Sequence, residues 1–269
     1  MPPVTPDGHH APMDLSAHVT ALAEATGRFA RDAQAAGLDA RVPTCPGWSV
    51  RDLIAHQGMV HRWATAQVLG NSAGIEVPAA FEEEGLAHAD PVSWLVEGSS
   101  ALIAALAAAP ADLEAFVFLA DAPAPREFWA RRQCHETTIH AADALSARIG
   151  GMPSARLSEV SSPVAVDGLD ELLTGFLPRP KSKLRTQQPV RVAVRPTDVD
   201  RAWIVEVRAE QPAATRHTAE AVELDDADVT FRGTAADLCL GLWNRGDEVT
   251  TDDEAMLARW RELARVTWG

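Results

Sequence analysis

The sequence predicts a multidomain protein of the α and α+β classes, in which an N-terminal four-helix bundle precedes a smaller α+β domain. Two changes in pattern support this prediction. Up to Gly150 apolar residues recur at the three-and-four spacing of amphipathic helices, whereas from Val190 onward they alternate with the two-residue period of strands. The stretch 151–162 contains proline and indicates a linker. We therefore expect one domain at residues 13–150 and a second at residues 163–269.

Helix signals place four segments in the bundle, after a leader of a dozen residues that is rich in Pro, Gly and His. Gly37 ends the first segment, and Ser49, with Asp52 three positions later, has the capping pattern that begins the second. Residues 70–90 contain Gly, Pro and an acidic run, so we expect a solvated connection there. The four helices are predicted at residues 13–36, 50–69, 91–108 and 125–144.

The C-terminal part mixes strands and helices. A short helix is expected at residues 168–177, and Thr234 and Asp252 are suited to cap two later helices. The sequence contains no internal repeat, no Gly-rich phosphate loop and no GxSxG nucleophile elbow. The strands are predicted at residues 190–196, 202–210 and 228–233, and the later helices at 234–243 and 252–266.

Composition excludes several classes of protein. The chain has 269 residues, of which 46% are hydrophobic, so it can bury a core without disulfides. A formal net charge of -14 argues against nucleic acid or an anionic membrane as a partner. Three scattered cysteines and the absence of a secretory signal or an apolar run of transmembrane length predict a protein of the reducing cytoplasm. Since no heptad seam is visible, we expect a monomer.

The strongest chemical signal is the segment REFWARRQCHETTIHAADA, which carries Glu136 and His140. Residues four apart on a helix differ by about 40° in direction, so these two side chains can face one ion. His56 of the second helix is the best third ligand. Three N/O ligands with an open fourth position are typical of a catalytic zinc site, although another divalent metal would also suit them.

Simpler interpretations compete with the metal site. Arg132 lies four residues before Glu136 and could pair with it. A zinc-protease helix carries two histidines four apart, but His135 and His140 are five apart and face directions about 140° apart. Cys134, about 200° from Glu136 on the helix, is expected to pack in the core rather than bind metal.

Three motifs together resemble the mycothiol-dependent maleylpyruvate isomerase family. They are VPTCPGWSVRDLIAHQGMVHRWA, RQCHETTIHAADA and DVTFRGTAADLCLGLWNRGD, at residues 42–64, 132–144 and 228–247. The resemblance implies a DinB-like metal-binding bundle followed by a sterol-carrier-like domain, with mycothiol as cofactor. It also implies that the zinc ligands are His56, Glu136 and His140. The family's active centre includes an arginine from the C-terminal domain, for which Arg232 and Arg245 are candidates; each is otherwise an ordinary exposed arginine.

The expected partners are therefore a small-molecule substrate and a low-molecular-weight thiol. The first hypothesis is a zinc- and mycothiol-dependent cis-trans isomerase of maleylpyruvate or a related unsaturated acid. The second is a mycothiol S-transferase that acts on an electrophile, and the third is a non-enzymatic metal- and small-molecule-binding protein. Among the remaining residues, Asp143 either orients a ligand or is solvated, while His61, Trp48 and Trp63 are expected to be structural.

Overall fold

The computed structural model describes residues 13–71, 77–119, 121–219 and 227–266, and most of the predicted leader, with His9 and His10, lies outside them. The chain divides into two compact units, each described here by itself. Of the described residues, the N-terminal unit comprises those from Asp14 to Phe118 and from Ala122 to Pro153, and the C-terminal unit comprises those from Ser154 onward.

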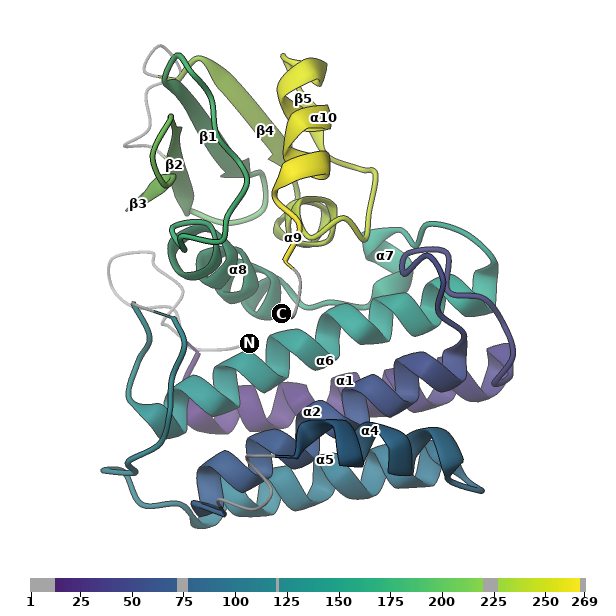
Figure 1. The fold of residues 1–269 in the computed structure, drawn as a ribbon. Coiled ribbons are helices and arrows are strands. Elements are labelled where there is room, and N and C mark those ends of the chain that lie inside the picture. Colours follow the sequence, from purple (N-terminus) through teal and green to yellow (C-terminus); the bar gives the residue numbers. More distant parts are fainter. Residues whose placement is uncertain (1–12, 72–76, 120, 220–226, 267–269) are drawn as a thin grey trace. The chain divides into compact units, whose positions relative to one another are not determined.

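Four long helices form the N-terminal unit, as the sequence predicts (Figure 1). They are α1 (Leu15–Ala36), α2 (Val50–Leu69), α5 (Pro91–Ala108) and α6 (Pro125–Ile149). Helix α1 packs on α6 and α5, and α2 packs on α5 and α6. Ser49 accepts a hydrogen bond from the backbone N–H of Asp52, whose side chain in turn accepts one from the Ser49 backbone, so the predicted capping box begins α2.

The connection between α2 and α5 is more structured than the sequence predicts. Helix α4 (Pro78–Ala87) lies against α2 within the stretch expected to be solvated. One residue of its acidic run contacts the bundle: Glu84 accepts a hydrogen bond from the indole N–H of Trp94 at 2.9 Å. Gly85 lets that indole approach, since a Cβ at this position would lie 2.7 Å from the Trp94 ring.

Within the described part of the chain, α5 is the one helix long and apolar enough to span a membrane. Half of its apolar window is buried inside the structure. It packs on α2 and α1, as expected of a helix in the core of a bundle.

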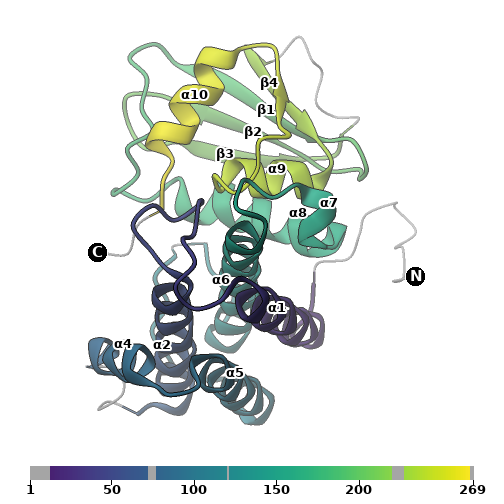
Figure 2. The same ribbon diagram turned by 90° about the vertical axis from the view of Figure 1, so that its right-hand side faces the viewer.

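The C-terminal unit is built on a five-stranded sheet in the order β3-β2-β1-β4-β5. Figure 2 shows β4, β1, β2 and β3 side by side. Strand β1 pairs antiparallel with β2 and parallel with β4. The ring of Trp260 on α10 packs edge-to-face on Phe231 of β4, with centroids 5.6 Å apart, so α10 covers part of the sheet. The strands are β1 (Val190–Pro196), β2 (Ala202–Val207), β3 (Ala213–His217), β4 (Val229–Gly233) and β5 (Thr250–Thr251).

The helices of this unit differ from the prediction mainly at its start. The single turn α7 (Ala155–Ser158) lies in the expected linker. The helix expected at residues 168–177 begins earlier, as α8 (Ser162–Asp170), and continues into the π-helical segment η1 (Glu171–Phe176). Helices α9 (Ala235–Leu242) and α10 (Glu254–Leu263) lie where the sequence places them. Thr234 caps α9 as expected, but the cap of α10 is Asp253 and not Asp252, whose side chain accepts a hydrogen bond from the Thr230 backbone instead.

Candidate metal centre

Helices α2 and α6 bring the three predicted ligands together within the N-terminal unit. The Oε1 atom of Glu136 lies 3.4 Å from Nε2 of His140 and 3.9 Å from Nε2 of His56. One ligand atom from each of the three residues lies within 4.8 Å of the others. All three residues are buried, with exposed fractions of 7–8%. The i,i+4 spacing on α6 thus places the carboxylate beside one imidazole, and α2 supplies the second.

These distances fit a divalent ion of the size of zinc. Ligands about 2.0–2.2 Å from a tetrahedral centre are separated from one another by roughly 3.3–3.6 Å. The 3.4 Å separation of Glu136 and His140 meets this value, and a small shift of His56 would complete the set. Two imidazoles and one carboxylate are also the donor types of many catalytic zinc sites. The described residues therefore fit the implied metal.

A hydrogen-bond chain holds His140 in place. Its Nδ1 lies 2.8 Å from Oδ2 of Asp143, whose side chain is fully buried. The hydroxyl of Thr44 donates to the other oxygen of Asp143, and Thr44 also contacts the hydroxyl of Ser146. Because the carboxylate accepts the proton of Nδ1, Nε2 is the ring nitrogen that faces Glu136. Asp143 thus orients a candidate ligand and is not solvated.

The second oxygen of Glu136 is engaged by Arg132. Nη2 of Arg132 donates to Oε2 at 3.0 Å, and the Arg132 side chain is 1% exposed. Arginine pairing and metal binding looked like alternatives in the sequence, but they use different oxygens of one carboxylate. Burial by itself raises the pKa of Glu136, but hydrogen bonds with His140 and His56 and the charge of Arg132 hold this pKa well below its usual value.

The protonation of His140 is set by two carboxylates. Burial lowers the pKa of His140, whereas the hydrogen bonds to Asp143 and Glu136 outweigh burial and raise that pKa to about 9. Without a bound cation, the imidazole is therefore protonated on both nitrogens and positively charged at neutral pH. A metal ion must displace the proton on Nε2 in order to bind that atom.

The loop before α2 contributes two residues that the sequence did not place at the site. The ring of Trp48 is tilted over His56 at 5.0 Å and stacks near His140 at 6.3 Å. Trp48 also packs against the bundle core, so its expected core role is combined with a position beside the ligands. Cys45, three residues earlier, forms a second close group with His140 and Asp143. The only sequence signal for this proximity was the PTCPGW turn that directly precedes the capping box.

Other conspicuous residues of the bundle are structural. His61 is fully buried, and its Nε2 atom lies 2.9 Å from Nε2 of Gln57 and 2.9 Å from the hydroxyl of Thr137. Gln57 in turn donates to the hydroxyl of Thr137 at 3.0 Å. Burial lowers the pKa of His61 to about 3, so this imidazole is neutral. Trp63 packs edge-to-face on Trp129 with centroids 5.3 Å apart.

Both candidate arginines belong to the C-terminal unit. Arg232 is exposed on β4, where its carbonyl accepts a hydrogen bond from the hydroxyl of Thr250. Arg245 is half-buried in the turn after α9 and donates to the carbonyl of Trp243 at 3.0 Å. The entry of either arginine into the active centre stays a prediction.

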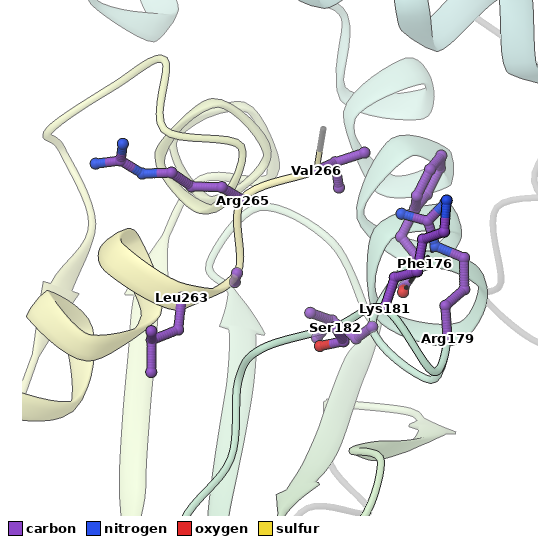
Figure 3. A pocket seen from close by; sticks show the side chains of 9 residues that line it. Phe176, Arg179, Lys181, Ser182, Leu263, Arg265 and Val266 are labelled. Atoms are coloured by element: carbon purple, nitrogen blue, oxygen red, sulfur yellow. Dashed lines mark hydrogen bonds between the residues drawn. The ribbon is translucent and has the colours of Figure 1, made fainter. Parts of the chain in front are cut away.

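A shallow hollow in the C-terminal unit does not include these arginines (Figure 3). Residues 176–182 line one side of it and residues 263–266 the other. The guanidinium of Arg179 lies 4.4 Å above the ring of Phe176, whereas that of Arg265 points away from this pair. Because the cationic groups do not converge on one point, we assign no ligand to the hollow.

Comparisons with known proteins agree with the two-part architecture. A family model described as the mycothiol maleylpyruvate isomerase N-terminal domain matches residues 19–145, and a model described as the MDMPI C-terminal domain matches residues 163–261. The chain belongs to the mycothiol-dependent maleylpyruvate isomerase family. The resemblance stated from the three sequence motifs is therefore confirmed.

Two solved structures described as mycothiol-dependent maleylpyruvate isomerases have a similar fold. The crystal structure of a mycothiol-dependent maleylpyruvate isomerase matches with a TM-score of 0.56 at 16% identity, and covers 89% of this chain and 93% of that one. A histidine-to-alanine mutant of an enzyme with the same name matches with a TM-score of 0.58 at 15% identity and the same coverage. The predicted class, a helical bundle followed by an α+β domain, is confirmed. A comparison with curated proteins finds no match.

Proposed function

We propose that this protein is a zinc-dependent enzyme that uses mycothiol to isomerise maleylpyruvate or a related unsaturated acid from cis to trans. The observation that carries the proposal is the convergence of His56, Glu136 and His140 on one point. Membership of the mycothiol-dependent family supports the choice of thiol, and three free cysteines suit the cytoplasm, where such a thiol stays reduced.

The residues of the bundle would prepare the site for a thiol. His56, Glu136 and His140 hold the cation, which when bound favours the nucleophilic thiolate form of the cofactor. Asp143 keeps the Nδ1 proton on His140 and so leaves Nε2 free to bind. Trp48 covers one side of the ligands and excludes water there. No cysteine of the protein is needed as a nucleophile.

The reaction then proceeds by reversible addition. The bound thiol would supply a nucleophile that adds to one alkene carbon while the π electrons move onto the conjugated carbonyl. The former double bond could then rotate, and elimination of the thiolate would restore it in the trans geometry. Arg232 or Arg245 would bind a substrate carboxylate with two hydrogen bonds and stabilise the enolate charge.

An assay with zinc-loaded protein, mycothiol and maleylpyruvate tests the proposal. Absorbance follows isomerisation, while mass spectrometry detects a thiol conjugate. We expect the trans isomer to accumulate only when mycothiol is present. A conjugate without the trans isomer would instead indicate an S-transferase. If neither product formed, the remaining hypothesis would be a non-enzymatic binding protein.

Substitutions test the assigned roles separately. His56→Ala should lower zinc content and thiol-dependent turnover together, and full zinc occupancy in that variant would refute its role as a ligand. Of Arg232→Ala and Arg245→Ala, the variant that removes the substrate-binding arginine should raise the KM for the acid while leaving zinc content unchanged.

A further inference from the structure

Glu136 is contacted on both oxygens by groups with different roles. Its Oε1 faces the two histidines, at 3.4 Å from His140 and 3.9 Å from His56. Its Oε2 accepts a charge-assisted hydrogen bond from Arg132 at 3.0 Å. One oxygen of the Glu136 carboxylate therefore faces the candidate metal position, and the other is bound by the buried guanidinium of Arg132.

The Arg132 contact is strong and well fixed. Arg132 is 1% exposed and lies one helical turn before Glu136 on the same helix. Breaking a buried ion pair by removing one partner is strongly destabilising, so Oε2 is not easily released. A rigid helical spacing, rather than a loop, sets this geometry.

This division limits how Glu136 can bind a metal. A carboxylate coordinates through one oxygen or chelates through both, and chelation here would require Oε2 to leave Arg132. With one oxygen from Glu136 and one nitrogen from each histidine, the protein supplies three ligands, and a tetrahedral centre keeps one position for a further molecule. With both oxygens, the carboxylate would fill that position.

We propose that Arg132 is a positioning residue that restricts Glu136 to one-oxygen coordination and thereby keeps one coordination position open for the cofactor thiol. The inference rests on the proposed metal site and extends it to a residue that touches neither metal nor substrate. Arg132 preserves access for the thiol at the cost of a second metal–oxygen bond.

Cobalt substitution provides the test, because the visible spectrum of cobalt distinguishes four-coordinate from five-coordinate sites. In the wild type we expect the intense bands of a four-coordinate centre. In Arg132→Met, Glu136 is free to chelate, so the absorbance per bound cobalt should fall. The KM for mycothiol should rise by about tenfold or more, with a smaller change in kcat. Arg132→Lys, which keeps a cation within reach of position 136, should restore the four-coordinate spectrum.

The controls separate the possible failures. Arg126→Met removes another arginine of α6, which pairs with Glu127 at 2.9 Å, and should leave spectrum and KM unchanged. If Arg132 serves only stability, Arg132→Met would lose metal or melt earlier, with an unaltered spectrum per bound cobalt. That result would overturn the inference but not the proposed function. A wild-type protein that binds no divalent metal would overturn the proposed function itself.

A measurement on the wild type keeps the inference testable if Arg132→Met does not fold. Infrared difference spectra between metal-loaded and metal-free protein report the splitting of the carboxylate stretches. We expect the wide splitting of a carboxylate bound through one oxygen. The narrow splitting of a chelating carboxylate would overturn the role of Arg132.

Discussion

Replacement of Asp143 by Asn should weaken metal binding without removing a ligand. The amide has the shape of the carboxylate, and its oxygen can still accept the hydrogen bond from Thr44. Its NH2 group then faces Nδ1 of His140, where the carboxylate now lies at 2.8 Å. An NH2 donor favours the tautomer with the proton on Nε2, which is the atom directed at Glu136. A protonated Nε2 cannot bind a cation.

The expected loss can be bounded. Changes in the groups that orient metal-binding histidines typically cost 10–100-fold in affinity, or about 1.4–2.8 kcal/mol. Since Asp143 is fully buried and accepts from two partners, we expect Asp143→Asn to lie at the upper end of this range. Removing the charge also lowers the pKa of His140, because the hydrogen bond to Asp143 is the largest contribution that raises it, and the weaker competition from protons offsets part of the loss at neutral pH.

Competition with a chromogenic zinc chelator at fixed pH measures the effect. Asp32→Asn is the matched control, because Asp32 is another buried carboxylate of the same unit, 2% exposed and paired with Arg31 and Arg148. This control should keep the zinc affinity within about twofold even if it unfolds more easily. An Asp143→Asn protein that bound zinc as tightly as the wild type would refute the assigned role of Asp143.

Three further predictions concern protons. Zinc binding should release a proton from His140, whose pKa is about 9, so titrations from pH 8 to 6 should show the affinity falling about tenfold per pH unit. His61, with a pKa lowered to about 3, should make stability decrease as pH falls from about 6.5, and His61→Gln should reduce that slope in acid unfolding. Asp52→Ala should cost about 1 kcal/mol in chemical unfolding at neutral pH, and less once acid protonates the wild-type carboxylate, whose pKa is lowered.

The long helices could be predicted because they depend on regular spacing, and the same spacing brings two of the three candidate ligands together. The capping box at Ser49 and the terminating glycine at Gly37 are local signals, and both act as expected. Glu136 and His140 share a helix, so their proximity follows from the helical repeat. His56 lies on another helix, to which no spacing rule applies, so the residues alone indicated it only as the best candidate and the resemblance then implied it.

The sequence did not predict features that arise from contacts between segments distant in the chain. Strand β3 contains Ala213–His217, which is too polar for a strand signal, and its pairing with β2 defines it. Helix α4 looked solvated because its acidic run is conspicuous, while its contact with Trp94 is not. The position of Trp48 beside His56 arises from a loop, whose path no periodicity describes.

Helix α6 explains why this bundle is suited to chemistry rather than only to packing. Over 25 residues it buries charged and polar side chains on several sides, a costly arrangement unless each group is paired. Around the candidate centre, Glu136 pairs with the guanidinium of Arg132, and Asp143 pairs with the imidazole of His140, which is protonated on both nitrogens at neutral pH. A divalent cation would replace the proton on Nε2 and satisfy the same carboxylates. The buried groups around the candidate centre are therefore arranged so that they can accept a positive charge.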